Sequence, residues 1–318
     1  MQLIIIKVSV VFVYLLIGYI CNKLRVVPIE AYKYMTSLIL NVTAPCLMVA
    51  SVTQQELKSG MLGNTIIAFL ISAVGFFILI PVTMWIARRF RGLEHRDDAN
   101  VLAVGMTASN CGFMGMPIAQ SVFGNPLFYY FVIQNAAYNL YMFSGSIMHL
   151  HLGEESSHSR RRSLKETLCQ MVNITNIALI FAIILLFAGL HLPDYIFGIV
   201  DTIGDTTIPL SMIMVGVQLA ECDLKKILSN RRLYFVSFAK LIMIPALVLL
   251  VVWFLPIDRT IKLSTILIVA FPTAVISAAI AEQEGKNSKL MAEVVASTTF
   301  LSIITLSLWI LFLSYLFD

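Results

Sequence analysis

Charged side chains are scarce in this sequence. Asp, Glu, Lys and Arg together make up 13% of the 318 residues, whereas they make up about 25% of a typical soluble domain. Apolar residues make up 59%, and the mean hydropathy is +0.88. The chain is therefore predicted to be a polytopic membrane protein. Its net charge of +4 comes from basic residues in predicted loops, which is not the pattern of a nucleic-acid-binding surface.

Cysteine and histidine patterns that form disulfides or hold metals are also missing. The five cysteines are scattered, with no CxxC pair and no histidine at ligand spacing, so neither a disulfide framework nor a metal site is predicted. The histidines fall in predicted loops or at helix ends, at His95, His149, His151, His158 and His191. A membrane-embedded enzyme would need a nucleophile or a metal cluster. We therefore expect neither catalysis nor a cofactor.

Long apolar runs fill most of the chain. A spanning helix needs about 20 mostly apolar residues. By this measure ten spans are predicted, at about 3–22, 34–52, 64–87, 99–122, 126–150, 173–191, 198–219, 233–254, 262–282 and 290–316. The first run is too long for the apolar region of a signal peptide and ends in Lys23 and Arg25. We interpret it as the first span.

Basic residues in the predicted loops indicate the orientation. With the N-terminus outside, most loop Lys and Arg residues lie inside, and the outer loops keep only Lys58, Arg259 and Lys262. This pattern satisfies the positive-inside rule and places both termini outside a cell membrane. Polar residues 152–172 are predicted to form a cytoplasmic connector between two five-span halves, 1–151 and 173–318. Because five is odd, we expect an all-α fold of two inverted repeats.

A short motif recurs in the equivalent span of each half. The second span contains NVTAP from Asn41, and the seventh contains DTTIP from Asp205. Proline removes one helix hydrogen bond, and short polar side chains can bond to the backbone groups left free. Each motif is at least a kink. Asn41 and the ionisable Asp205 are also candidates for lining a transport pathway.

Two spans are interrupted near their middle. Residues 108–119 of the fourth span read ASNCGFMGMPIA, and residues 271–273 of the ninth read FPT. Irregular backbone at membrane depth persists only where it is buried in protein or lines a cavity. Paired interruptions in corresponding halves are typical of a transporter's binding site; two ordinary proline kinks are the alternative. The candidate substrate-binding residues here are Asn110, Cys111, Gly112, Gly115, Pro117, Pro272 and Thr273. Helix N-termini near Pro117 and Thr273 would favour an anion such as a carboxylate.

Several polar residues lie within the other predicted spans. Asn135 and Asn139 stand four residues apart in the fifth span and so share a helix face. Their amides could satisfy freed backbone groups or bind a substrate. Lys240 lies in the eighth span, where a buried cation needs a partner. Three partners are considered: Asp205, helix-end carbonyls, or an anionic substrate. Asp205 and Lys240 are also the candidate groups for proton coupling.

The sequence resembles the auxin efflux carrier family of membrane transporters, in its short bacterial-type form. The matching segments, in chain order, are LILNVTAPCLMVASV, NCGFMGMPI with the following FGNP, LSMIMVGVQLA, KLIMIPA, and FPTAV followed by STTFLSIITLSLWI. No single segment is a sharp signature. Their number and order carry the resemblance.

The resemblance implies a division of labour among the ten helices. Helices at about 3–52 and 173–219 would form a scaffold that also dimerises. Helices at about 64–150 and 233–316 would form a transport domain that slides as an elevator. The broken fourth and ninth helices would cross at their prolines, with Asn110 facing the ligand. Family members move auxin in plants and are implicated in malate or malonate uptake in bacteria. The long cytoplasmic domain of the plant carriers is absent here.

The sequence therefore predicts a secondary carrier for a small organic anion, a monocarboxylate or dicarboxylate such as malate or malonate. It would work in a lipid bilayer, as a homodimer and without nucleic acid, either as a uniporter or coupled to protons. Two alternatives remain open: a sodium-coupled organic-anion symporter and a non-transporting receptor for a carboxylate. Related bile-acid symporters hold sodium partly through an acid in the ninth helix, and this chain has none there until Glu282.

Overall fold

The fold is seen in a computed structural model that describes residues 2–57, 59–89, 96–153, 173–221 and 230–317. Every regular element in these residues is a helix, and they contain no strand. The predicted all-α class is therefore confirmed for this part of the chain. Most of the predicted connector, at 152–172, lies outside the described residues.

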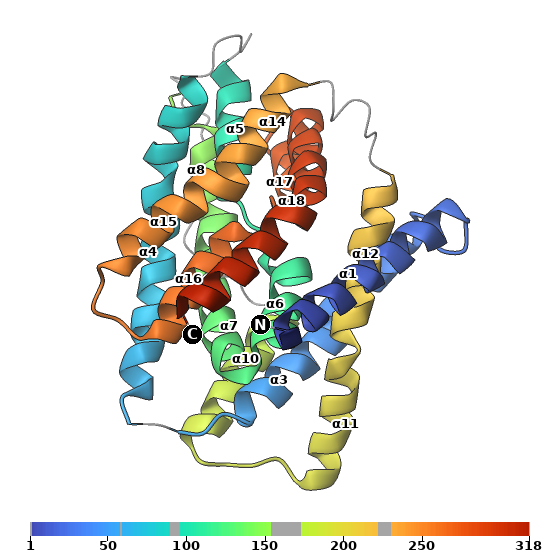
Figure 1. The fold of residues 1–318 in the computed structure, drawn as a ribbon, viewed down its shortest axis with the longest axis vertical. Coiled ribbons are helices and arrows are strands. Elements are labelled where there is room, and N and C mark those ends of the chain that lie inside the picture. Colours follow the sequence, from blue (N-terminus) through green and yellow to red (C-terminus); the bar gives the residue numbers. More distant parts are fainter. Residues whose placement is uncertain (1, 58, 90–95, 154–172, 222–229, 318) are drawn as a thin grey trace.

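The helices follow one another along the described residues (Figure 1). In the first half they are α1 (Gln2–Lys23), α2 (Ala31–Leu38), η1 (Ile39–Thr43), α3 (Ala44–Thr53), α4 (Met61–Arg88), α5 (Arg96–Thr107), η2 (Cys111–Gly115), α6 (Met116–Ile118), η3 (Ala119–Phe123), α7 (Asn125–Leu140), η4 (Tyr141–Gly145) and α8 (Ser146–Leu150). In the second half they are α10 (Ile174–Phe187), α11 (Asp194–Asp205), α12 (Thr207–Ala220), α14 (Arg231–Phe238), η5 (Ala239–Met243), α15 (Ile244–Trp253), α16 (Arg259–Ala270), α17 (Ile276–Gln283) and α18 (Ser288–Phe317). The elements labelled η are short π-helices.

Seven helical runs in the described residues are long and apolar enough to cross a membrane. They are Ile6–Lys23, Ala31–Thr53, Met61–Arg88, Asp98–Phe123, Asp194–Ala220, Arg231–Trp253 and Ser288–Phe317. The other three predicted spans are less regular. The sixth becomes the shorter apolar helix α10, the ninth is divided between α16 and α17, and the fifth is the run from α7 to α8.

Prolines explain several π-helical turns. Pro45, Pro117 and Pro245 each follow a π-helix, at the second residue of the next α-helix. A proline ring clashes with the carbonyl four residues earlier and offers no N–H. The wider π turn accommodates that clash without ending the helix. The carbonyl four residues before Pro245 is that of Leu241, which accepts a hydrogen bond from Trp309 Nε1 at 2.7 Å.

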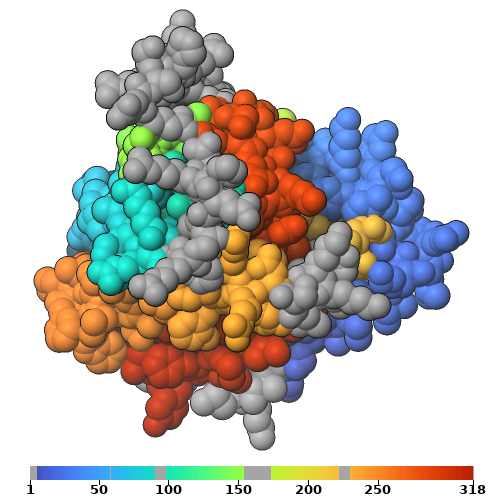
Figure 2. All heavy atoms as spheres, turned by 90° about the horizontal axis from the view of Figure 1, so that it is seen from above, coloured from blue at the N-terminus to red at the C-terminus, as the bar shows by residue number. Residues whose placement is uncertain are grey.

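The helices pack in two groups. The first contains α1, α2, α3, α10, α11 and α12, and the second contains α4, α5, α7, α8 and α14 to α18. In both views α4 and α15 lie on one side of the molecule, and α1 with α2 on the other (Figures 1 and 2). Contacts are reciprocal between the halves. The first helix of each half packs on the second unit of the other half, as α1 packs on α12 and α10 packs on α3.

Glycines allow α1 and α12 to touch backbone to backbone. A Cβ atom at Gly216 would collide with the Leu15 carbonyl, and one at Gly18 would collide with the backbone of Ile213. Small residues at such crossings are the usual means of close packing in membranes. The first group is therefore held by an interface that tolerates no side chain at these two positions.

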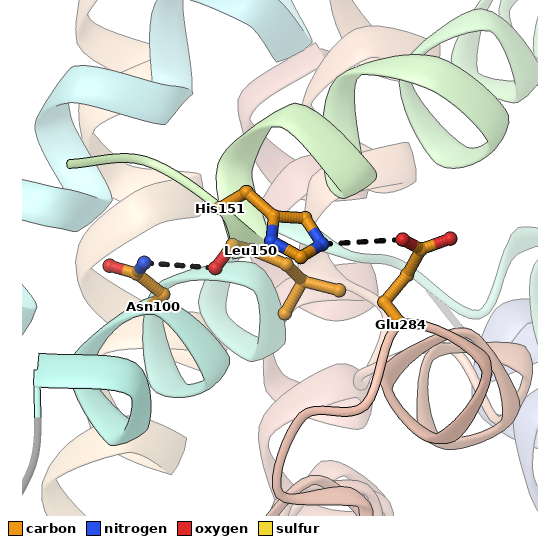
Figure 3. Close-up of polar contacts among 4 residues, drawn as sticks. All are labelled: Asn100, Leu150, His151 and Glu284. Atoms are coloured by element: carbon orange, nitrogen blue, oxygen red, sulfur yellow. Dashed lines mark hydrogen bonds and ion pairs between the residues drawn. The ribbon is translucent and has the colours of Figure 1, made fainter. Parts of the chain in front are cut away.

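One end of the second group is joined by polar contacts. Asn100 of α5 donates from Nδ2 to the Leu150 carbonyl at 2.9 Å, at the end of α8. The adjacent His151 places Nε2 3.2 Å from Oε2 of Glu284, just after α17 (Figure 3). Three helices from both halves of the chain therefore meet through side chains at this end.

Candidate functional site

The interruptions in the fourth and ninth spans contact each other directly. Helix α5 ends at Thr107, and residues 108–110 are not helical. Helix α16 ends at Ala270, and α17 starts only at Ile276. Between the breaks, the Asn110 backbone N–H donates to the Pro272 carbonyl at 2.7 Å. A backbone donor freed by one interruption is thus satisfied by a backbone acceptor of the other, although the two segments are far apart in the sequence.

The first break, at residues 108–110, lies within the predicted interruption 108–119 but does not include Pro117. Pro117 was expected at the crossing, but it lies within α6, buried and helical. The π turn before it absorbs the proline clash, so the helix continues there. The helix is interrupted instead at Ser109 and Asn110, short polar residues whose side chains can replace helical partners. The N-terminus facing the break is therefore at Cys111.

Pro272 accounts for the second break and for the hydrogen bond that Ser109 donates to it. The ring of Pro272 leaves the Ile268 carbonyl, four residues earlier, without a helical donor. Ser109 Oγ donates to that carbonyl at 2.5 Å and lies 3.4 Å from the Phe271 carbonyl. Cys111 Sγ lies 3.8 Å from the same Ile268 carbonyl. The first break thus supplies the donors that the second break lacks.

Thr273 and Gly115 support the crossing. The Thr273 N–H donates to Thr298 Oγ1 at 3.1 Å, and Thr273 Oγ1 donates to the Gly105 carbonyl at 2.7 Å. Gly115 leaves no room for a side chain, since a Cβ would lie 2.7 Å from the Phe131 ring. Both residues are buried. They join the broken helices to their neighbours.

Lys240 is fully buried at 0% exposure, and its partners are neutral. Its Nζ donates to the Val269 carbonyl at 3.3 Å and to Ser109 Oγ at 3.4 Å. Asp205 is exposed at the end of α11, and the described residues contain no ion pair between it and Lys240. The considered ion pair between Asp205 and Lys240 is therefore not formed in this structure. Lys240 is instead paired with a helix-end carbonyl, because it lies beside the end of α16.

A cavity of about 270 Å³ lies beside the first break. Six predicted site residues line it: Asn41, Asn110, Cys111, Gly112, Asn135 and Asn139. Gly115, Pro117, Pro272 and Thr273 do not, although Ala274, Val275 and Ile276 of the second break do. The other lining residues are Leu40, Ser109, Phe113, Met116, Tyr138, Met142, Phe143, Asn173, Ile174, Thr175 and Asn176.

Sequence reasoning missed the start of α10. Asn173 caps this helix, since its Oδ1 accepts a bond from the Asn176 N–H at 2.8 Å, and Thr175 Oγ1 donates to the Leu40 carbonyl at 2.8 Å. A run of Asn and Thr before apolar residues is the usual signal of a helix N-cap. Its place opposite the breaks could not be seen without the fold. Tyr138, a polar residue of the predicted fifth span that was not selected as a site residue, also belongs here; its Oη accepts from the Ser109 N–H at 2.9 Å.

The cavity offers polar groups without a net charge. Asn110 and Asn135 are 4% and 6% exposed, and their side-chain amides form no hydrogen bond with the described residues. The N–H groups of Gly112 and Phe113 likewise have no backbone partner there. Both asparagine side chains line the cavity, so a molecule inside it can reach their amides. These groups can donate hydrogen bonds to an anion or a neutral acceptor that enters the cavity.

Comparison with known proteins identifies the family of this chain. The chain is 25% identical over 302 residues to an uncharacterized transporter of Methanothermobacter thermautotrophicus, with 94% of this chain and 95% of the relative covered. A family model described as membrane transport protein matches residues 3–310. This match confirms the resemblance to the auxin efflux carriers. The chain belongs to this family of membrane transporters.

Proposed function

We propose that the protein is a secondary carrier that moves a small organic anion, such as malate or malonate, across the cell membrane. One observation carries the proposal: amides without partners line a cavity where the backbones of two broken helices meet, at Asn110 and Pro272. Broken helices in a transporter place substrate and ion sites at such points. Membership of a transporter family supports the same class of function.

An anion in the cavity would be bound by helix dipoles and amide groups, since none of the described residues that line the cavity is charged. The run from Cys111 and the helix from Ile276 both begin at the cavity. A helix N-terminus carries partial positive charge and free N–H groups. Asn110 and Asn135 would complete the coordination of a carboxylate. Lys240 lies behind Ser109, which lines the cavity.

The two packing groups suggest how access could alternate. Leu40, Asn41 and Asn173 come from the first group of helices, whereas Asn110 and Asn135 come from the second. A substrate in the cavity would therefore lie at the boundary between groups. We propose the first group as the dimerising scaffold, 3–52 with 173–219, and the second as the moving domain. Reciprocal packing between halves supports two inverted five-helix repeats. The distribution of basic residues among the predicted loops supports both termini outside.

Transport would be either uncoupled or coupled to proton movement. The pair of Asp205 and Lys240 does not form, so neither can act by exchanging a proton with the other. A uniporter needs no coupling group. Counterflow without an imposed ion gradient would distinguish it from a proton-linked carrier.

Uptake by proteoliposomes tests the proposal. Purified protein is reconstituted, and saturable uptake of radiolabelled malate, malonate and monocarboxylates is measured. The change Asn110→Leu should reduce uptake at least tenfold, since loss of a hydrogen bond to a charged group costs about 1.5–3 kcal/mol. Asn64→Leu is the matched control because Asn64 lines a different pocket, with Tyr130 and Asp258. Equal uptake by the wild type and Asn110→Leu, with both folded, would remove the proposed site.

A further inference from the structure

Lys240 is an ionisable residue at a position where packing alone does not require one. It is fully buried, and its two acceptors are a carbonyl and a hydroxyl. Burying an ammonium without a carboxylate is unfavourable, and an apolar side chain of similar size would pack at lower cost. Methionine or leucine would fill this volume. A function that needs the positive charge is therefore the better explanation of a lysine here.

The charge lies at the negative end of a helix. The last carbonyls of α16 have no helical donors, because the helix ends at Ala270 and Pro272 has no N–H. These carbonyls form the negative end of the helix dipole. Lys240 Nζ donates to Val269, and it donates to Ser109 Oγ, which in turn donates to Ile268. One ammonium group thus neutralises the end of α16 directly and through a hydroxyl.

The matching end of α5 has no such charge. There the Gly105 carbonyl accepts a bond from Thr273 Oγ1 at 2.7 Å, and Thr107 Oγ1 lies 3.0 Å from Thr83 Oγ1. Neutral hydroxyl groups cap this helix. The positive charge at the crossing is therefore confined to one of the two broken helices.

We propose that the Lys240 ammonium occupies the place of a small monovalent cation at the helix crossing, so that the protein needs no bound sodium there. Carbonyls at the ends of broken helices, with a hydroxyl, are the ligands that coordinate sodium in transporters of this type. Lys240 supplies the charge as part of the chain. Because Ser109 lines the cavity, the same charge also favours an anion there; this second part rests on the proposed function.

The unmodified protein gives the first test. Its thermal unfolding midpoint is measured in sodium chloride and in choline chloride at equal ionic strength. Since a ligand of the folded state raises the midpoint, a protein without a sodium site should unfold at the same temperature in both salts. A sodium-specific rise that saturates with concentration would overturn the proposal.

Chemical rescue gives the second test. Lys240→Ala removes a propylammonium-sized group, and the midpoint should fall by about 5–7 °C. Added n-propylammonium chloride should restore about half of this loss, whereas the neutral isostere 1-propanol should not. Lys262→Ala is the control, because Lys262 is a lysine outside this network whose Nζ donates to the Trp253 carbonyl at 2.9 Å. Equal rescue by propanol, or equal rescue of the control variant, would refute the cation role.

Lys240→Met covers the case in which the alanine variant does not fold. Methionine fills the space without charge but leaves the Val269 carbonyl without this donor, so the midpoint should fall less than in Lys240→Ala and should not respond to propylammonium. The concentration of malonate that stabilises the protein should rise about tenfold or more. Unchanged affinity would overturn the role in anion binding. If propylammonium rescues Lys240→Ala while no carboxylate is transported, the proposed carrier function fails and the cation inference stands. If carboxylates are transported but propylammonium gives no rescue, the carrier function stands and the cation inference fails.

Discussion

Ser109→Ala tests whether the two breaks depend on each other. Ser109 Oγ is nearly inaccessible, donates to the Ile268 carbonyl at 2.5 Å and accepts from Lys240. Alanine removes this oxygen and changes the volume little. The substitution leaves the Ile268 carbonyl with only the weak thiol donor of Cys111, at 3.8 Å, and takes one of two acceptors from Lys240.

The magnitude follows from those two losses. A buried group left without its partner costs about 1–3 kcal/mol, and a hydrogen bond to a charged group contributes about 1.5–3 kcal/mol. The two losses overlap, so we expect the free energy of unfolding to fall by about 2–4 kcal/mol. For a protein of this size the unfolding midpoint should fall by about 3–6 °C.

Thermal unfolding of the purified protein is the assay, with Ser264→Ala as the matched control. Ser264 is equally buried, but its Oγ donates to Ile261 in its own helix. A bond of that local kind contributes little to stability. If Ser109→Ala lowers the midpoint no more than Ser264→Ala does, the coupling of the breaks through this hydroxyl is refuted.

Two further predictions concern helix packing. Gly216→Leu should prevent stable folding or lower stability by more than about 3 kcal/mol, because its side chain would collide with the backbone of Leu15 and Tyr19. Folded yield and the unfolding midpoint measure this effect. Trp309→Phe should lower stability by about 1–3 kcal/mol, because the Leu241 carbonyl loses its donor. The unfolding midpoint measures this loss as well.

Each of these predictions has a control of the same chemistry. A Cβ at Gly198 of α11 would meet nothing within 4 Å, so Gly198→Leu should be nearly neutral. Trp253 is 47% exposed, so Trp253→Phe should change the midpoint little. Equal losses in test and control variants would show that the residue type matters and the contact does not.

The chemistry of the chain predicted the membrane class, the helical fold and the family. A scarcity of charge over long apolar runs leaves no alternative to helices in a bilayer, because the backbone must satisfy its own hydrogen bonds there. The same argument located both interruptions within a few residues. Asn110, Asn135 and Asn139 were selected because their amides are unusual at membrane depth, and all three line the cavity.

Pro117 was expected at the helix crossing because proline weakens a helix, but it lies inside the helical segment after the first break. Pro117 lacks an N–H wherever it lies, but a π turn can absorb that defect. A helix ends where other groups can satisfy its backbone. For Asn110 that group is the Pro272 carbonyl, which is remote in sequence. No local pattern could have identified it.

The sequence by itself determined that this is a helical membrane protein of a transporter family with two weakened helices, since hydropathy and backbone chemistry are local properties. Only the tertiary structure decided which groups meet. It separated Asp205 from Lys240 and placed Lys240 at the end of α16. It also brought Asn173 of α10 to the cavity beside the breaks. Such partners depend on how distant helices cross, and the packing of the whole chain sets those crossings.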